Sequence, residues 1–249
     1  MSGALRYGHL VIATALAWMA APAETSTAAV TSSNFAVANV QPADGEVVGV
    51  GMPVTVRFAR PIADRAAAEQ SIRITSPTNT DGSFSWLNNN AVQWIPSELW
   101  PAHSQIRLST QNLSTEFATG AAVVGVADIS SHTFTVSIDD QVVREMPASM
   151  GKPKFPTPVG RYTALSRERS VTFDSRTIGI PLNDPEGYLI KGEYAVRVTW
   201  GGVYVHSAPW SVGSQGNANV SHGCINLSPA NAAWYFDTVS IGDPIIVQA

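Results

Sequence analysis

The stretch HTFTVSIDDQVVREM, residues 132–146, decides the fold class of this 249-residue chain. Apolar side chains alternate with Thr and Ser over residues 132–138, which is the pattern of a half-buried strand. Residues 139–140 are two aspartates suited to a turn, and residues 141–146 return as the partner strand. The stretch therefore predicts a β-hairpin and favours a mainly β domain around it.

The rest of the C-terminal half fits this prediction. Residues 151–160 hold three prolines and predict a constrained loop. Ser228 followed by Pro229 is the start signal of a helix, which we expect to end near Asp237. Further strands are predicted at residues 161–164, 200–206 and 244–247.

The N-terminal half consists of short apolar runs separated by turn residues. Residues 54–58 (VTVRF) alternate as a half-buried strand should, and one helix is expected over residues 63–70. Several short strands within one domain's length predict an immunoglobulin-like β-sandwich over residues 35–120. The other strands are expected at residues 37–40, 72–74, 91–94 and 105–108.

Catalytic residue types do not gather in this first domain. Its one histidine, His103, stands alone, so we interpret the domain as a spacer or a module that presents substrate. Residues 120–125 (GAAVVG) are the expected junction, and residues 125–249 the second domain.

Composition excludes two broad classes. Hydrophobic residues make up 45% of the chain and charged residues 14%, which rules out general disorder. A net charge of −4 lacks the basic footprint of a nucleic-acid-binding protein, so no nucleic-acid partner is expected.

The N-terminus has the features of an export signal. Residues 1–9 carry Arg6 and no acid, residues 10–23 are uncharged, and residues 21–23 form an A-x-A pattern. We expect a signal peptide over residues 1–23, a linker over residues 24–34, and export to the periplasm or cell wall. Without cleavage, the apolar segment would remain as a membrane anchor; lipid attachment is excluded because no cysteine lies there.

Cys224 is the only cysteine, so an intramolecular disulfide and a multi-cysteine metal cage are both excluded. A lone thiol can be an inert buried residue, a dimerisation point or a nucleophile. An exported protein needs a reason to keep a thiol exposed to oxidation, which favours the last interpretation.

The neighbourhood of Cys224 fits nucleophilic catalysis. His206 ends a predicted strand, and a polar loop then returns the chain to Cys224, so the two residues can face one another. His206 would take the thiol proton, Ser207 would orient the imidazole through its hydroxyl or carbonyl, and Gly223 would let backbone amides approach an oxyanion. This is the chemistry of acyl transfer through a thioester.

A metal site is the alternative use of the same residues. His206, His222 and Cys224 could form an open zinc site, but no acid or further histidine lies nearby to orient them. We therefore expect neither a metal nor a cofactor.

Residues 125–249 resemble the catalytic domain of the L,D-transpeptidases (the YkuD-type family) of bacterial cell-wall synthesis. The resemblance rests on His206, on residues 221–226 (SHGCIN) and on residues 157–162 (TPVGRY). Much of the family has a glycine and an arginine where this chain has Ser207 and Asn226. In this respect the chain is similar to the mycobacterial-type branch. The immunoglobulin-like first domain fits that branch too.

The resemblance implies a role for each matching position. Cys224 would be the acylated nucleophile, His206 its base and Ser207 the orienting partner. His222 and Gly223 would shape the site, with the amides of Gly223 and Cys224 near the oxyanion. Substrate would be contacted by Tyr188, by a groove lined with Gly201, Gly202 and Asn226, and by Trp210 in a covering loop.

The implied reaction joins two peptidoglycan stem peptides. Cys224 would attack the third residue of a donor tetrapeptide, D-alanine would leave, and an amine of a second stem would form a 3→3 cross-link. Carbapenem β-lactams would be expected to acylate the same cysteine. Two alternatives stay open: an L,D-carboxypeptidase that resolves the same thioester with water, and a cell-wall-binding protein with a degenerate site.

Overall fold

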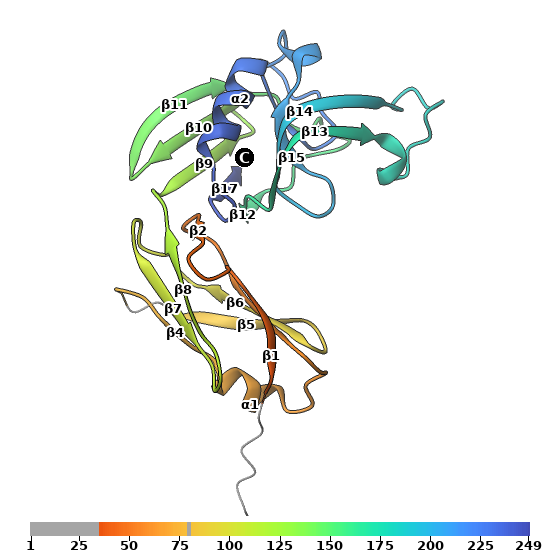
Figure 1. Cartoon of the computed structure of the whole chain (residues 1–249). Coiled ribbons are helices and arrows are strands. Elements are labelled where there is room, and N and C mark those ends of the chain that lie inside the picture. The colour runs from red at the N-terminus through yellow and green to blue at the C-terminus, as the bar shows by residue number, and fades with distance from the viewer. Residues whose placement is uncertain (1–34, 79–80) are drawn as a thin grey trace, which may run out of the picture. The chain divides into compact units, whose positions relative to one another are not determined.

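The computed structural model describes residues 35–78 and 81–249, and its strands form two domains (Figure 1). The mainly β fold expected from the sequence is confirmed. The signal peptide, its cleavage point and the linker lie outside the described residues. Among the described helices, none has both the length and the apolar character needed to cross a membrane.

The N-terminal domain is the predicted sandwich of two four-stranded sheets, ordered β1-β3-β6-β5 and β2-β8-β7-β4. Alternation explains its core, because Val56 and Phe58 of one sheet and Ile106 and Leu108 of the other are buried. A short helix, α1 (Arg65–Gln70), begins at the capping side chain of Asp64. The strands are β1 (Val37–Gln41), β2 (Val47–Val48), β3 (Val54–Phe58), β4 (Arg73–Thr75), β5 (Gly82–Asn88), β6 (Ala91–Pro96), β7 (Gln105–Ser109) and β8 (Ser114–Thr119).

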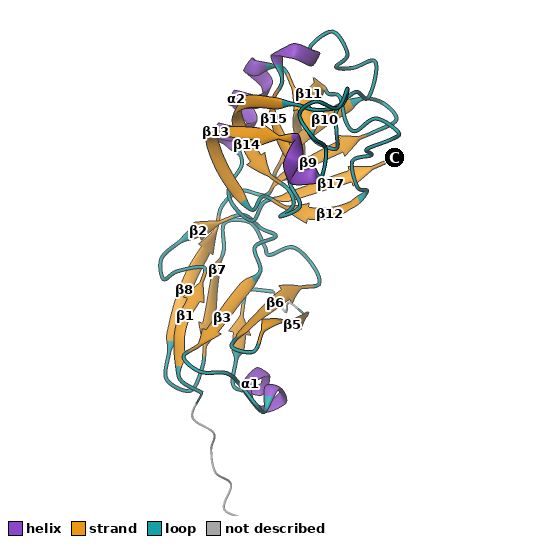
Figure 2. Cartoon of the chain, turned by 90° about the vertical axis from the view of Figure 1, so that its right-hand side faces the viewer, coloured by secondary structure: helices purple, strands orange, loops and turns teal. Residues whose placement is uncertain are grey.

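The C-terminal domain also contains two sheets, ordered β11-β10-β9-β17-β12 and β13-β14-β15-β16. Figure 2 shows these strands with the one long helix of the domain, α2 (Pro229–Thr238). The strands are β9 (Val123–Asp128), β10 (Thr133–Ile138), β11 (Gln141–Pro147), β12 (Gly160–Thr163), β13 (Ser166–Asp174), β14 (Leu189–Arg197), β15 (Tyr204–Ser207), β16 (Ile225–Leu227) and β17 (Pro244–Gln248). Two 3₁₀ turns cover Ser175–Ile178 and Pro209–Ser211.

Two local predictions of this domain hold. The β10–β11 hairpin turns at Asp139 and Asp140, whose φ angles of +47° and +65° suit the tight turns that hairpins prefer. Helix α2 begins where expected, because the Ser228 side chain accepts a hydrogen bond from the Asn231 amide at 3.4 Å. The helix packs its Tyr235 ring edge-on against Phe134 of β10, with ring centroids 4.8 Å apart.

Several segments differ from expectation, among them the following three. The strand predicted over residues 200–206 begins only at Tyr204, because residues 200–202 form a turn in which Gly202 has a φ of +100°. Strand β9 takes in the second half of the expected junction, since alternate residues from Val123 onward are buried. The long β13–β14 hairpin was not predicted at all; most of β13 is exposed or half-buried, so it has no apolar alternation to read.

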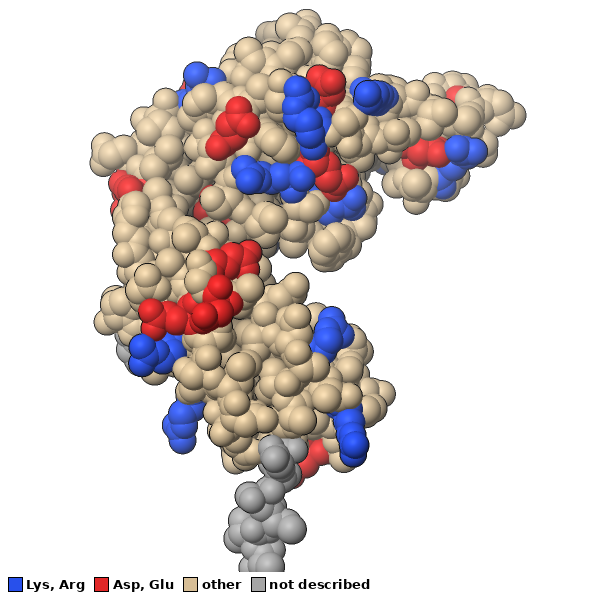
Figure 3. All heavy atoms as spheres, viewed as in Figure 1, with Lys and Arg blue, Asp and Glu red and all other residues tan. Residues whose placement is uncertain are grey.

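The surface in view in Figure 3 mixes basic and acidic side chains among a larger uncharged area. This distribution follows from a composition with only 14% charged residues and both signs in similar numbers.

Candidate active site

Strands β15 and β16 bring His206 and Cys224 to one place. They pair in parallel, with His206 opposite Asn226, and Cys224 is the residue just before β16. All four residues of β15 and all three of β16 are buried, so both strands run through the interior. A parallel ladder of two short strands thus fixes two residues that lie far apart in the sequence.

His206 is held in one tautomer by the backbone. Its Nδ1 lies 2.8 Å from the carbonyl oxygen of Ser207, and a carbonyl can only accept, so Nδ1 carries the proton of the neutral ring. Nε2 is therefore left as a proton acceptor. Burial lowers the pKa of His206 to about 4, although its hydrogen bonds with Ser207 and Asn226 oppose this shift.

The thiol of Cys224 is also neutral at rest. Cys224 keeps partial exposure, but the crowding of protein atoms around its sulfur raises the pKa of the thiol to about 12. Sγ lies 3.7 Å from the carbonyl oxygen of Gly202, to which the S–H can donate. At rest the thiol and the imidazole that share this site are consequently both neutral, since both pKa values disfavour an ion pair.

Two hydroxyl groups shape the turn that precedes Cys224. Ser221 Oγ accepts from the Gly223 amide at 3.0 Å and donates to the Cys224 carbonyl at 2.7 Å. Thr157 Oγ1 accepts from the Gly151 amide and donates to the Gly223 carbonyl, both at 2.8 Å. Gly223 itself has a φ of +120°, which other residues rarely adopt. The backbone before the nucleophile is thereby held from both sides.

A cavity of about 350 Å³ opens in front of Cys224. We call its buried side, formed by His206, Cys224 and Asn226, the strand wall. The cavity brings together six of the residues singled out from the sequence: Tyr188, His206, Trp210, His222, Cys224 and Asn226.

Four predicted residues do not line this cavity. Ser207 and Gly223 lie behind it and act through their backbones. Gly202 reaches Cys224 with its carbonyl, whereas Gly201 is exposed on the turn before β15. The Gly223 amide that we expected near the oxyanion already donates to Ser221.

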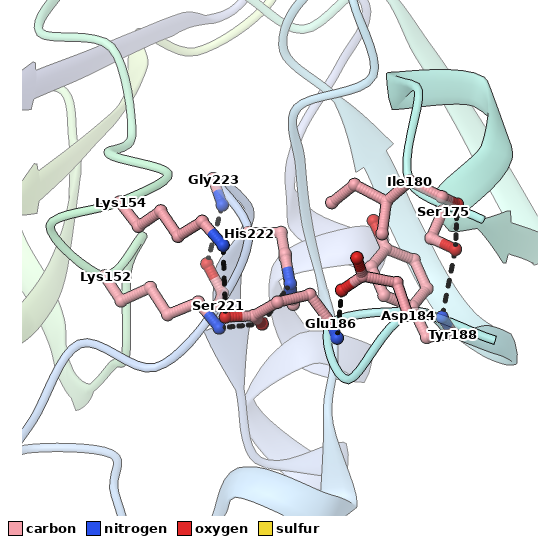
Figure 4. A network of polar contacts seen from close by, with 10 residues as sticks. All are labelled: Lys152, Lys154, Ser175, Ile180, Asp184, Glu186, Tyr188, Ser221, His222 and Gly223. Atoms are coloured by element: carbon pink, nitrogen blue, oxygen red, sulfur yellow. Dashed lines mark hydrogen bonds and ion pairs between the residues drawn. The ribbon is translucent and has the colours of Figure 1, made fainter. Parts of the chain in front are cut away.

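The loop between β13 and β14 brings Tyr188 to the cavity. Buried Ser175 braces this loop, because its hydroxyl accepts from the Tyr188 amide at 3.0 Å and donates to the Ile180 carbonyl at 2.9 Å (Figure 4). The Tyr188 ring lies against His222, with centroids 4.9 Å apart, and burial raises the pKa of its hydroxyl.

A group of charged side chains around Glu186 of this loop was not predicted from the sequence. The Glu186 carboxylate meets the Lys152 ammonium and lies 3.0 Å from His222 Nε2, with Lys154 3.9 Å from its other oxygen (Figure 4). Lys152 lowers the pKa of Glu186, and burial lowers that of His222. We call Lys152, Lys154, Glu186 and His222 the charged rim.

No local sequence pattern predicts the charged rim, because Lys152 and Glu186 come together only when the tertiary structure forms. Within the described ranges, no group of three or more His, Cys, Asp or Glu residues is arranged to hold a metal ion.

Comparison with known proteins agrees with the geometry of the site. Residues 122–247 match the model of the L,D-transpeptidase catalytic domain, and residues 4–116 match that of a bacterial Ig domain. The chain belongs to the L,D-transpeptidase family. It is therefore related to acyltransferases, and the resemblance drawn from its SHGC motif is confirmed.

Individual relatives are similar over nearly the whole chain. L,D-transpeptidase 1 of Mycobacterium tuberculosis (strain ATCC 25618 / H37Rv) is 57% identical, covering 99% of each chain. A solved L,D-transpeptidase from Mycobacterium smegmatis is 66% identical with a TM-score of 0.83, covering 87% of this chain and 100% of that one. The structure of LdtMt1 in complex with imipenem is 61% identical with a TM-score of 0.82, covering 86% and 99%.

Proposed function

We propose that this L,D-transpeptidase forms 3→3 cross-links between peptidoglycan stem peptides through a thioester on Cys224. The observation that carries the proposal is the pairing of His206, oriented by the Ser207 carbonyl, with the thiol of Cys224 in one cavity. Family membership supports the substrate class, and the geometry supports the roles proposed for His206 and Cys224.

Acylation begins from the neutral pair. Sγ of Cys224 attacks the carbonyl carbon of the donor's third residue while its proton passes to Nε2 of His206. The bond to D-alanine then breaks, and the leaving amine takes that proton from the imidazolium. The Ser207 carbonyl accepts a hydrogen bond from the Nδ1–H group throughout, which favours the ring in its charged, transient form.

The second half-reaction reverses these proton movements. An amine of a second stem attacks the thioester carbon, His206 takes its proton, and the C–S bond breaks with the proton returning to sulfur. If water attacks instead, the same steps produce a tripeptide, which is the L,D-carboxypeptidase alternative.

The remaining residues orient the substrate and its developing charge. Because the Gly223 amide donates to Ser221, we assign the oxyanion to the Cys224 amide. Tyr188, Trp210 and Asn226 line the cavity and would contact the donor.

The same thiol is the site at which we expect carbapenems to react. A solved relative was described in complex with imipenem, and another, L,D-transpeptidase 3 of M. tuberculosis, with a faropenem-derived adduct. A function in cross-linking peptidoglycan supports a location outside the cytoplasm, which is also what the export signal expected at residues 1–23 predicts.

Intact mass measurement of residues 24–249 with a disaccharide-tetrapeptide tests the proposal. We expect a donor adduct that is lost in Cys224→Ala, with release of D-alanine and formation of a cross-linked dimer. Release of D-alanine with free tripeptide and no dimer would identify a hydrolase. Absence of both adduct and turnover would favour a binding protein.

A further inference from the structure

The loop of residues 181–188 lines the cavity with its last four residues. Residues 181–185 are all exposed, whereas Glu186 and Tyr188 are half-buried, and Pro185, Glu186, Gly187 and Tyr188 line the cavity. Inside the loop, the Asp184 carboxylate accepts a hydrogen bond from the Glu186 amide at 2.8 Å. The Glu186 side chain points away from the loop (Figure 4).

The partners of Glu186 belong to the part of the molecule that carries the nucleophile. His222 is two residues before Cys224, and its Nε2 lies 3.0 Å from Glu186 Oε2. Lys152, which meets the same oxygen, is tied to that turn by its own amide, 3.0 Å from the Ser221 carbonyl. One carboxylate therefore connects the exposed loop to two groups that are attached to the turn before Cys224.

The side chains around the Glu186 carboxylate are partly buried, which strengthens the contact between them. The side chains of Glu186, Lys152 and His222 are 26%, 25% and 20% exposed. An ion pair that is partly removed from water, such as Lys152 with Glu186, is stronger than a pair in full contact with solvent, and the same carboxylate also contacts His222 Nε2.

We propose that Glu186 is a positioning residue that fastens the 181–188 loop across the cavity and so controls access to the thiol of Cys224. With the fastening intact, the loop keeps bulk water from the acyl-enzyme and gives the acceptor amine time to react. The effect on how the acyl-enzyme divides between the acceptor amine and water rests on the proposed function. The control of access to the thiol does not.

Alkylation of Cys224 by iodoacetamide measures access without any peptidoglycan substrate. We expect Glu186→Ala to be alkylated about fivefold faster than the parent chain, because losing the fastening lets the loop open. Glu186→Gln, which keeps an accepting oxygen, should lie between the two. Lys154→Met is the matched control: Lys154 is 67% exposed and 3.9 Å away, so its rate should stay within about 1.5-fold.

A double variant separates the fastening from a general loosening. Lys152→Met combined with Glu186→Ala should be no faster than the quicker single variant, since both remove the same contact. Additive rates, or an unchanged rate in a Glu186→Ala protein with the parent's melting temperature, would overturn the proposal.

Turnover with the disaccharide-tetrapeptide distinguishes this inference from the function on which it partly rests. In Glu186→Ala, the fraction of product that is free tripeptide should rise about twofold or more, because water enters the opened site. If alkylation responds while the parent chain makes neither dimer nor tripeptide, control of access stands and the proposed function fails. If the parent makes dimers and Glu186→Ala alters neither rate nor partition, the function stands and the inference fails.

Discussion

The strand wall and the charged rim each contribute a histidine to the same cavity, yet the two histidines are built for different work. His206 is 3% exposed and its Nδ1 faces the neutral carbonyl of Ser207, which leaves Nε2 as the proton-accepting nitrogen. His222 has its Nε2 occupied by the carboxylate of Glu186 and is packed between the rings of Phe155 and Tyr188. The partner of a ring nitrogen, more than the residue type, decides which histidine can transfer a proton.

Removing each imidazole ring in turn is the strongest test of the different roles of His206 and His222. His206→Ala should lower kcat/KM by about a thousandfold or more, because the thiol loses its base. His222→Ala should cost about tenfold, since the ring only positions the loop and the turn. Steady-state kinetics with the tetrapeptide donor measures both, and equal losses would mean that the two histidines share the proton transfer.

The pH dependence of acylation assigns the base without any mutation. The pKa of His206 is lowered to about 4, so the imidazole is protonated and inactive below that pH and becomes a base as pH rises. Single-turnover acylation should therefore increase between pH 3 and 5, about tenfold in all, and stay level through neutrality. A midpoint near the ordinary histidine value, with the fold shown intact by circular dichroism, would contradict the assignment.

Substitution of Thr157 tests how much its two hydrogen bonds stabilise the turn before Cys224. Thr157→Val removes both bonds and leaves the Gly151 amide and the Gly223 carbonyl without this partner, in a place where Thr157 is 2% exposed. We expect the free energy of unfolding to fall by about 2 kcal/mol in urea titrations. Lys154→Met, from the charged rim, should change it by less than about 0.5 kcal/mol.

The smallest effect is expected at the residue that looks catalytic in the sequence. Ser207→Ala keeps the backbone carbonyl that orients His206, so kcat should remain within about twofold of the parent value. A loss as large as that of His206→Ala would transfer the orienting role to the hydroxyl.

Sequence reasoning reached the strand wall because its signals are local. A lone cysteine after Ser-His-Gly, and a helix start at Ser228 and Pro229, are readable without neighbours. Alternation located strands such as β3 and β10, which bury one face.

The charged rim and its supporting hairpin escaped for the opposite reason. Strand β13 buries little, so it shows no period of two. The strand predicted over residues 200–206 includes two glycines, although Gly202 requires a turn. Glu186 gains its meaning from Lys152 and His222, residues that only the folded chain brings to it.

The parallel pairing of β15 with β16 has a consequence for engineering. Both ends of the connection between the two strands are anchored by the ladder, so residues 208–220, which precede the turn of Ser221 and Gly223, can be exchanged without changing which residue faces His206. This segment carries Trp210 and Ser214 into the cavity. Grafting it from a related enzyme is thus a route to altered substrate choice on an unchanged reaction centre.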